Sequence, residues 1–340
     1  MARSVHFLTF GQSYAELGYG RSFSYWPFAV AMRRMIDSAP AALSSALGVT
    51  VTAGDMTQLR QVAVGGSAIR EEFANGNSYW VTNGNGNGPS LTSAVNAIAG
   101  YAVKPQFAIW SHGERDAQFV NTQTDVDNVR SAVVNRLFPG IRAALNSGAP
   151  LGVRIFVDML GFRYVADEAR ENMMRDMMIG VINDQPNVMR GAEKYAIELD
   201  STFHPTQIGY QTLGAHTGRR IAAQLATGSN LEAPSIASAS RSGNNVTVNI
   251  NVPSGGALVK PTHPAHFGLY DAGGVRLPYS ASWSGDSVTL TCPSQPATLR
   301  YPAREARFDA SRIIRLSDPA DPIFPGEPGL PLQSRLPISL

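Results

Sequence analysis

The sequence predicts an α/β protein: a three-layer sandwich with a parallel sheet flanked by helices, followed by a small C-terminal antiparallel β-domain. From about residue 5 to 226, short apolar runs alternate with amphipathic segments, an order typical of a parallel sheet wrapped by helices. After about residue 233 the chain becomes rich in Ser, Thr, Val, Gly and Pro, and segments such as 245–252 alternate strictly between apolar and polar residues. We therefore expect an α/β domain at 1–230 and a β-sandwich-like accessory domain at 231–340, with a Pro-rich tail extended on the surface.

Each element follows from its local pattern. Short apolar runs predict strands of the first domain, at 5–10, 49–52, 61–64, 106–110, 153–157 and 195–199. Apolar residues at helical spacing predict helices at 21–37, 91–103, 124–146, 167–183 and 207–226. Residues 75–89, rich in Gly and Asn, predict a loop, and Ser90 is the expected cap of the helix that follows. Strands of the second domain are expected at 245–252, 267–270 and 287–292.

Composition excludes several classes of protein. The 340 residues include 28 basic and 26 acidic side chains with no long basic run, so we expect no nucleic-acid partner. No apolar run approaches the roughly 18–20 residues that cross a bilayer, so we expect no membrane insertion. The N-terminus lacks the apolar core of a signal peptide, which leaves a cytoplasmic protein, a phage-associated protein or a mature secreted form as the expected settings.

The single cysteine, Cys292, excludes an intrachain disulfide and a zinc site built from several cysteines. Its strand-like context predicts a buried, inert thiol. The histidines outside the motifs described below have no carboxylates at metal-ligand spacing, so we expect no metal.

Two predicted strands end in small residues suited to chemistry, because active residues of such folds lie just past the carboxyl ends of strands. The segment 10–13 reads Phe-Gly-Gln-Ser and presents the Ser13 hydroxyl where a helix begins, a setting for a nucleophile; a helix cap is the plainer interpretation. The segment 62–69 runs into Gly65 and Gly66, where a backbone N–H can approach a ligand closely; an ordinary turn is the alternative.

Two further strand ends carry polar side chains. The segment 109–116 leaves a buried strand and places His112, Glu114 and Asp116 in one short stretch, which is either a functional edge or a solvated loop. The segment 200–206 contains His204, which needs an oriented partner to act as a base, and Asp200 is near enough in sequence to supply it.

Taken in this order, the four segments resemble the SGNH hydrolase superfamily, and more narrowly its sialate O-acetylesterase and plant-type carbohydrate acetylesterase group. Residues 11–13 resemble the Gly-Gln-Ser nucleophile block of that group, and residues 65–67 its Gly-Gly-Thr/Ser block. Residues 110–116 resemble its Trp-x-Gln-Gly-Glu-x-Asp block, and residues 204–210 its closing His block. The resemblance covers roughly residues 5–226; the β-domain more loosely resembles accessory domains of sialate esterases.

The resemblance implies a serine esterase that removes O-acetyl groups from a carbohydrate such as sialic acid, xylan or another glycan, without a cofactor. Ser13 would attack the ester carbonyl, His204 would transfer the proton, and Asp200 would orient His204. The N–H groups of Ser13 and Gly66 and the side chain of His112 would form the oxyanion hole. The expected supporting residues are Gln12, Glu114 and Asp116.

Two departures from the group's pattern bear on this mechanism. His112 stands where the group has Gln, so its role as a hydrogen-bond donor becomes pH dependent. The usual acid lies three residues before the histidine, where this chain has Ser201, whereas Asp200 lies four before it. A Ser–His dyad, or help from Glu114, therefore remains an alternative to the triad.

Tyr79 and Trp80, in the Asn/Gly loop, and Arg70 are candidates for substrate binding, the aromatic pair by stacking on a sugar. Core anchoring by the aromatics and a solvated arginine are the plainer alternatives. Two other functions stay open. One is a catalytically weak or inactive glycan-binding protein, for example a phage tail or surface component. The other is a non-carbohydrate esterase, although no long apolar lid favours lipids.

Overall fold

The computed structural model describes most of the chain, namely residues 4–19, 22–146, 148, 152–161, 167–200, 204–228, 233–254, 256–305, 308–317 and 329–340. The chain divides into two compact units, Met1–Leu231 and Glu232–Leu340. No helix among these described residues is both long and apolar enough to cross a bilayer.

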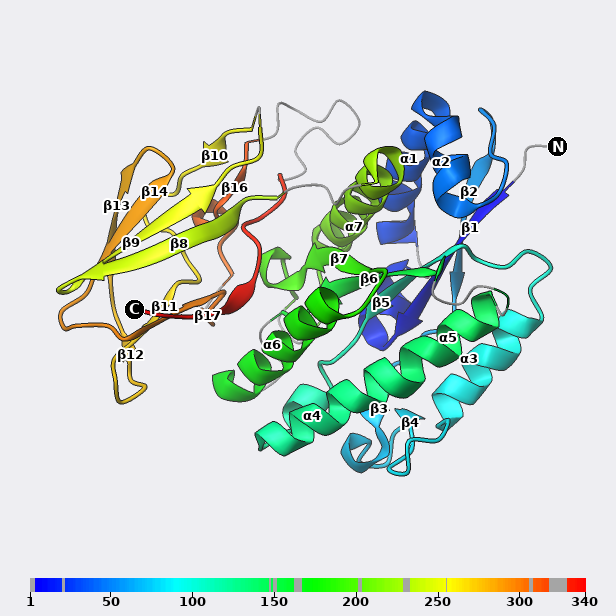
Figure 1. The fold of residues 1–340 in the computed structure, drawn as a ribbon, viewed down its shortest axis with the longest axis horizontal. Coiled ribbons are helices and arrows are strands. Elements are labelled where there is room, and N and C mark those ends of the chain that lie inside the picture. Colours follow the sequence, from blue (N-terminus) through cyan, green and yellow to red (C-terminus); the bar gives the residue numbers. More distant parts are fainter. Residues whose placement is uncertain are drawn as a thin grey trace. The chain divides into compact units, whose positions relative to one another are not determined.

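The first unit is built on a five-stranded sheet in the order β2-β1-β5-β6-β7 (Figure 1). All neighbouring strands are parallel. The central strands are buried along their length because helices cover both faces, which is why they read as continuous apolar runs. This sheet confirms the predicted fold class. Its strands are β1 Ser4–Gly11, β2 Met56–Gln61, β5 Phe107–Ser111, β6 Arg154–Met159 and β7 Val188–Glu193.

Helices cover the sheet in two layers (Figure 1). One layer packs around Phe7, Phe28 and Leu213, and consists of α1 Ser22–Ser38, α2 Pro40–Leu47 and α7 Gln207–Thr227. The other packs around Phe10 and Trp110, and consists of α3 Pro89–Ala99, α4 Gln123–Ala132, α5 Phe138–Leu145 and α6 Glu168–Asp184. Shorter helical turns are the π-helical Tyr14–Tyr19 and Val133–Leu137 and the 3-10 helices Glu71–Phe73, Asp116–Gln118, Lys194–Ala196 and Ala310–Arg312.

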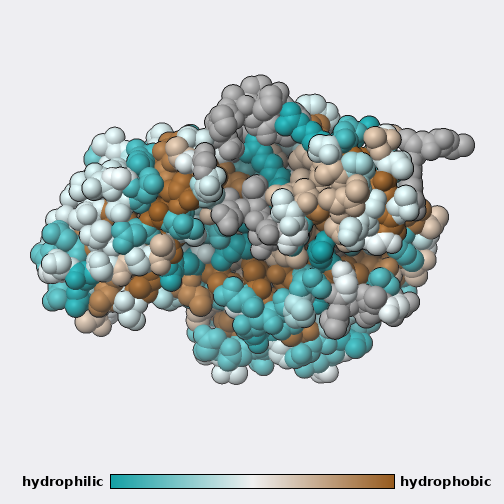
Figure 2. Space-filling model, turned by 45° about the horizontal axis from the view of Figure 1, so that its top comes forward, coloured by the Kyte–Doolittle hydropathy of each residue, from teal (hydrophilic) through white to brown (hydrophobic). Residues whose placement is uncertain are grey.

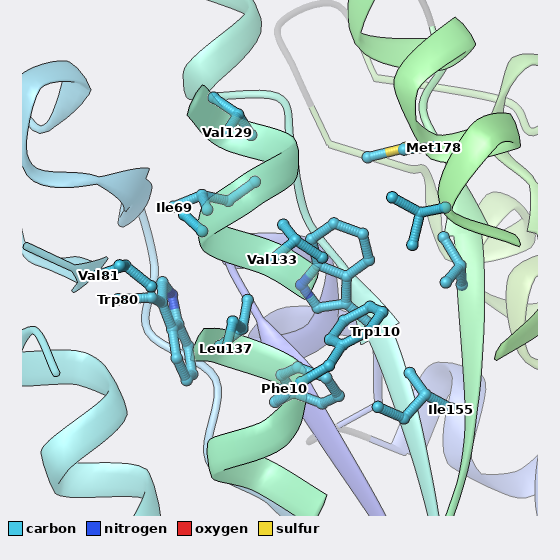
Figure 3. Close-up of a cluster of buried hydrophobic side chains, with 14 of the residues drawn as sticks. Phe10, Ile69, Trp80, Val81, Trp110, Val129, Val133, Leu137, Ile155 and Met178 are labelled. Atoms are coloured by element: carbon cyan, nitrogen blue, oxygen red, sulfur yellow. The ribbon is translucent and has the colours of Figure 1, made fainter. Parts of the chain in front are cut away.

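Aromatic rings pack among aliphatic side chains beneath the second of these layers (Figure 3). Phe10 meets Trp80 and Phe138 edge-on, each with 6.2 Å between ring centroids. Trp110 meets Phe138 at 5.1 Å and 90°. Such edge-to-face pairs add about 0.5–1.5 kcal/mol each beyond the burial of apolar area. This cluster therefore holds together the ends of β1 and β5, which contain Phe10 and Trp110.

Helix boundaries follow capping chemistry. Thr122 and Asp125 form a reciprocal capping box at the start of α4, and Thr206 caps α7 by accepting the Gly209 N–H. The predicted helix 124–146 is continuous but passes through a π-helical stretch before α5, where Pro139 has no N–H to donate to the preceding turn.

Five predictions about the first unit are wrong in detail. Residues 49–52 are not a strand, and the strand predicted at 61–64 overlaps β2 only at Gln61, because β2 lies at the edge of the sheet and is largely polar. The apolar run 195–199 is not the last sheet strand; β7 precedes it and carries an Arg, a Gly and a Glu that masked its strand character. The predicted loop 75–89 contains β4, Tyr79–Val81, which pairs in parallel with β3, Ala68–Arg70. Gly88, rather than Ser90, is the N-cap of α3, because the helix already starts at Pro89.

The second unit contains two four-stranded antiparallel sheets, β12-β11-β15-β17 and β13-β14-β9-β8, and the pair β10-β16. The alternating burial of β9 is what its sequence predicts. Much of the surface of this unit is white or teal in Figure 2. Its strands are β8 Ser235–Ser242, β9 Asn245–Asn251, β10 Leu258–Val259, β11 Gly268–Tyr270, β12 Arg276–Leu277, β13 Ser280–Ser284, β14 Ser287–Thr291, β15 Thr298–Tyr301, β16 Arg315–Leu316 and β17 Arg335–Ser339.

The end of the chain is not a surface tail where it is described. Leu330 and Leu332 are buried, and β17 pairs with β15. Residues 318–328, the other part of the predicted tail, lie outside the described residues. Cys292 is buried as expected, and burial raises the pKa of its thiol.

Candidate active site

The turn that follows β1 brings Ser13 to the carboxyl edge of the sheet. Gly11 has φ +131, and a Cβ at this position would lie 2.1 Å from the Ser111 carbonyl oxygen at the end of β5. Only glycine lets the two strand ends approach this closely. The Gln12 N–H then donates to the Ser111 oxygen at 3.1 Å, and the Gln12 carbonyl accepts from Ala15 and starts the π-helical turn.

Ser13 itself is half-buried, with hydrogen-bonding capacity left over. Among the described residues, neither its hydroxyl nor its main-chain N–H has a hydrogen-bond partner. A hydroxyl and an N–H at the same strand end, both unused, are what nucleophilic attack and oxyanion binding require.

The glycine loop after β2 lies beside this turn. Val62 donates to Thr9 and Val64 donates to Gly11, both at 3.0 Å, so the parallel pairing with β1 continues past the regular strand. A Cβ on Gly65 would lie 2.3 Å from the Glu16 carboxylate, which belongs to the Ser13 turn. Gly66 has φ +67, and its N–H has no main-chain acceptor within the described part of the chain.

His112 lies in the interior, behind the glycine loop. Its Nδ1 accepts the Gly113 N–H at 2.7 Å, which places the proton of the neutral ring on Nε2. Nε2 faces the Ser67 hydroxyl at 3.5 Å, and that hydroxyl donates to the Val64 carbonyl oxygen at 2.7 Å and accepts from Trp80 Nε1 at 2.9 Å. Burial, and then the positive charge of Lys194, lower the pKa of His112 to about 3. The ring is therefore neutral over the ordinary pH range.

Asp116 fastens the segment after the glycine loop. Its carboxylate accepts the Ile69 N–H with both oxygens at 2.9 Å and the Arg70 N–H at 3.3 Å. Burial raises the pKa of Asp116 to about 7, with the charge of Glu114 adding to the effect against the main-chain hydrogen bonds. Gln12 links the Ser13 turn to the segment that carries Asp116, since its Oε1 accepts the Arg115 N–H at 3.1 Å.

Glu114 forms a buried ion pair with Lys194, directly beneath the Ser13 turn. Lys194 Nζ also lies 4.7 Å from the centroid of the Tyr14 ring and 3.5 Å from Ser111 Oγ. The pair thus supports the residue that follows Ser13. Sequence reasoning placed Glu114 in a supporting role but missed Lys194 and Tyr14. One of only three lysines, placed directly after a strand, was the available signal.

The closing block brings His204 to the same edge. Its imidazole lies next to Tyr14, with 6.3 Å between ring centroids. Asp200 Oδ1 accepts the His204 main-chain N–H at 3.2 Å, and the Asp200 N–H donates to the His204 carbonyl oxygen at 2.6 Å. Asp200 therefore shapes the backbone that carries the histidine. Ser201, at the position of the usual acid, lies outside the described residues.

The loop after His204 depends on a close backbone approach. Thr206 Oγ1 donates to Glu198 Oε2 at 2.7 Å while its N–H donates to the Glu198 carbonyl oxygen at 3.1 Å. A Cβ on Gly209 would lie 2.1 Å from that same carbonyl oxygen. The glycine of this block is thus required for α7 to start where it holds His204 at the edge.

The predicted substrate-binding residues lie differently from expectation. Trp80 is fully buried and its indole N–H is used by Ser67, so in this conformation it anchors the loop instead of stacking on a ligand. Arg70 is also buried and pairs with Glu72 at 2.8 Å. Tyr79 is half-buried and donates to Glu71 Oε1 at 3.1 Å, a hydrogen bond that raises the pKa of Tyr79. An exposed side chain that sequence reasoning missed is Ile208, four residues after His204.

The described residues contain no group of three His, Cys, Asp or Glu side chains arranged to hold a metal ion.

Comparison with known proteins supports the fold that the structure shows. No protein-family model matches the chain, and no curated protein matches its sequence. Among solved structures, a carbohydrate acetylesterase from Xanthomonas citri is similar over 98% of this chain and 80% of its own, with a TM-score of 0.64 and 16% identity. A carbohydrate acetylesterase from Sinorhizobium meliloti matches at a TM-score of 0.39 and 13% identity, covering 64% of this chain and 99% of its own. The first of these likenesses supports the fold of the chain.

Proposed function

We propose that this protein is a serine esterase of the SGNH type that removes O-acetyl groups from a carbohydrate. The observation that carries the proposal is the place of His204 beside Tyr14, the residue that follows Ser13, with 6.3 Å between the centroids of the Tyr14 and His204 rings. The N–H groups of Ser13 and Gly66 point to an oxyanion hole at the same edge, because they have no acceptor among the described residues.

In this mechanism, Ser13 Oγ attacks the acetyl carbonyl carbon while His204 removes its proton. The tetrahedral intermediate carries its negative oxygen toward the N–H groups of Ser13 and Gly66. His204 then protonates the departing sugar oxygen, which leaves an acetyl-Ser13 intermediate. Water, deprotonated by His204, hydrolyses this intermediate and releases acetate. Asp200 supports the histidine through the backbone contact and, in the triad form of the mechanism, through its imidazole as well.

His112 supports the oxyanion hole through Ser67. The ring is neutral and directs its Nε2 proton at the Ser67 hydroxyl, so it stabilises the loop that carries Gly66. This role replaces the pH-dependent donor expected from the sequence, because a group with a pKa of about 3 does not change charge over the pH range in which esterases work.

The carbohydrate part of the proposal rests on resemblance. The four sequence blocks resemble a carbohydrate acetylesterase group, and the structure that is similar over 98% of this chain is named a carbohydrate acetylesterase. The fold by itself leaves the substrate open, since one fold hosts many substrates.

The test measures acetate release from p-nitrophenyl acetate and from a panel of acetylated sugars. We expect the wild type to turn over, and Ser13→Ala and His204→Ala each to lower kcat by roughly 10³-fold or more. Ser240→Ala, at an exposed position of β8 in the second unit, is the matched control for Ser13→Ala and should retain full activity. A wild type without activity, or activity indifferent to Ser13, would overturn the esterase proposal and favour a glycan-binding protein.

A further inference from the structure

A cavity of about 470 Å³ in the second unit has a strongly basic wall. Its size lies within the roughly 300–1,000 Å³ typical of small-molecule sites. The residues that matter for the argument are Arg276, Leu277, Tyr279, Arg304, Glu305 and Arg312, all of which line the cavity. Three arginines and one glutamate line the cavity, which leaves an excess of positive charge among its lining residues.

Arg276 and Glu305 form the fixed part of this wall. Arg276 Nη2 donates to Glu305 Oε1 at 3.0 Å and to the Phe267 carbonyl oxygen at 3.3 Å, and its Nη1 donates to the Arg304 carbonyl oxygen. Glu305 Oε1 also accepts the His266 N–H at 3.2 Å. The two side chains are therefore positioned before any ligand arrives, which lowers the entropy cost of binding.

Arg312 supplies the hydrogen-bond donors. Its Nε donates to the His263 carbonyl oxygen at 2.9 Å, which anchors the guanidinium by one edge. Its Nη1 lies 3.8 Å from Glu305 Oε2, too far for a hydrogen bond. Within the described residues, the two terminal nitrogens of Arg312 donate no hydrogen bond. The guanidinium is thus held by Nε and by a loose ion pair from Nη1 to Glu305, while its terminal nitrogens keep their hydrogen-bond donors for a planar carboxylate or a sulfate.

Apolar and aromatic side chains form another part of the lining, which includes Leu277, Tyr279 and Ala281. The Tyr279 hydroxyl donates to the Pro264 carbonyl oxygen at 2.8 Å, and the Tyr279 ring meets Phe267 edge-on at 6.2 Å. Burial raises the pKa of Tyr279 to about 12, so the phenol stays neutral. Leu277 adds a buried aliphatic side chain. A ligand for this cavity therefore needs apolar C–H groups, an anionic group for Arg312, and hydroxyl donors for Glu305 Oε2.

We propose that this cavity binds an anionic sugar residue, with Arg312 holding a carboxylate or sulfate and Glu305 accepting hydrogen bonds from ring hydroxyls. Sugars combine these features, because their C–H faces pack on apolar and aromatic surfaces while their hydroxyls donate hydrogen bonds. The site belongs to the second unit and would bind its ligand whether or not Ser13 is a nucleophile.

The test is binding to the full-length Ser13→Ala protein, measured by ligand-observed NMR titration. The probes are glucuronic acid, glucose 6-sulfate and glucose, which share one ring configuration and differ at position 6, together with sodium acetate and sodium sulfate. We expect at least one of the two anionic sugars to bind about tenfold or more tightly than glucose, and also more tightly than acetate or sulfate alone. The tighter of the two anionic sugars identifies the group that Arg312 recognises.

Arg312→Gln should weaken this binding by about tenfold or more, because it removes the charged guanidinium donors and leaves a shorter, neutral polar side chain. Arg315→Gln is the matched control: Arg315 also donates to one main-chain carbonyl oxygen, that of Ala310, but does not line the cavity. Ala281→Leu, which fills the cavity, provides a second variant if thermal unfolding shows that Arg312→Gln is misfolded. Equal binding of glucose and the anionic sugars, equal binding of the simple anions, or binding that survives both Arg312→Gln and Ala281→Leu overturns the proposal. Because no hydrolysis is measured, these results are independent of those for the esterase.

Discussion

His112 Nδ1 and Asp116 Oδ2 lie 3.7 Å apart, with both side chains fully buried. The distance suits an ion pair, but burial lowers the pKa of His112 to about 3 and raises that of Asp116 to about 7. The imidazole is therefore neutral wherever the carboxyl is charged. The two residues act instead through the main-chain and hydroxyl groups that they hold, on opposite sides of the glycine loop.

Asp116 gives the folding stability a specific pH dependence. The carboxyl ionises near pH 3.8 when unfolded and near pH 7 when folded, so the folded state binds more protons between these values and loses stability as pH rises. We expect Asp116→Asn to abolish this loss. The free energy of unfolding of the variant should therefore rise relative to that of the wild type from about pH 4 to pH 7, and the difference should stay constant above pH 7. Urea unfolding at successive pH values measures the difference. A constant difference over this range contradicts the assignment.

His112 has the opposite effect. The folded state binds fewer protons than the unfolded state between about pH 3 and pH 6.5, so stability from this group rises with pH and is lost as pH falls. His112→Gln removes the titrating group. The free energy of unfolding of the variant should therefore rise relative to that of the wild type as the pH is lowered from 6.5. The same urea series checks this, and a slope unchanged from the wild type would rule out a depressed pKa.

The buried pair Glu114–Lys194 should be costly to break. Lys194→Met leaves the Glu114 carboxylate buried without its partner, and we expect a loss of about 3–5 kcal/mol in the free energy of unfolding. Adding Glu114→Gln to Lys194→Met should recover much of that loss. Lys260→Met is the matched control, because Lys260 pairs with Asp286 on the surface and such pairs contribute about 0–1 kcal/mol. Similar losses in both lysine variants would show that the burial of the pair is not what matters.

Gly11→Ala tests the close approach of the two strand ends. The new Cβ would lie 2.1 Å from the Ser111 carbonyl oxygen. The backbone fixes the positions of both atoms, so neither can move aside as a flexible side chain would. We expect severe destabilisation, of the order of 3 kcal/mol or more, or loss of soluble protein. Gly48→Ala separates strain from collision, because Gly48 also has positive φ but has nothing within 4 Å of a Cβ. Its cost should be about 1 kcal/mol, and equal costs would mean that the contact is unimportant.

Asp200→Asn distinguishes the triad from the dyad. We expect kcat to fall by roughly 10²-fold or more with little change in KM, because the histidine loses the charge that stabilises its protonated form. Glu198→Gln serves as the control, since Glu198 braces the same loop through Thr206. If kcat falls by less than a few-fold in Asp200→Asn, the result supports the dyad. If kcat falls equally in Asp200→Asn and Glu198→Gln, the effect of Asp200 comes from the geometry of the loop alone.

The sequence predicted the layers of the first unit because strands covered on both faces are apolar throughout, and because long helices carry apolar residues at regular helical spacing. It misplaced β7, where Arg190 and Glu193 form an ion pair with each other inside the strand and Gly191 lets Asp158 of β6 approach closely. The blocks at the strand ends located the candidate site, since parallel strands deliver their carboxyl ends to one edge. The burial of Trp80 and the partnership of Lys194 depend on contacts between distant segments, which no local pattern contains.

The burial of Cys292 has a practical consequence for following this protein in solution. It is the only thiol in the sequence, it is buried, and its raised pKa keeps the reactive thiolate scarce. A cysteine introduced at the exposed Ile208, four residues from His204, would therefore be the one that a maleimide dye modifies. The native chain thus accepts a single fluorophore beside the candidate active site without first removing a cysteine, and that label would report ligand arrival there directly.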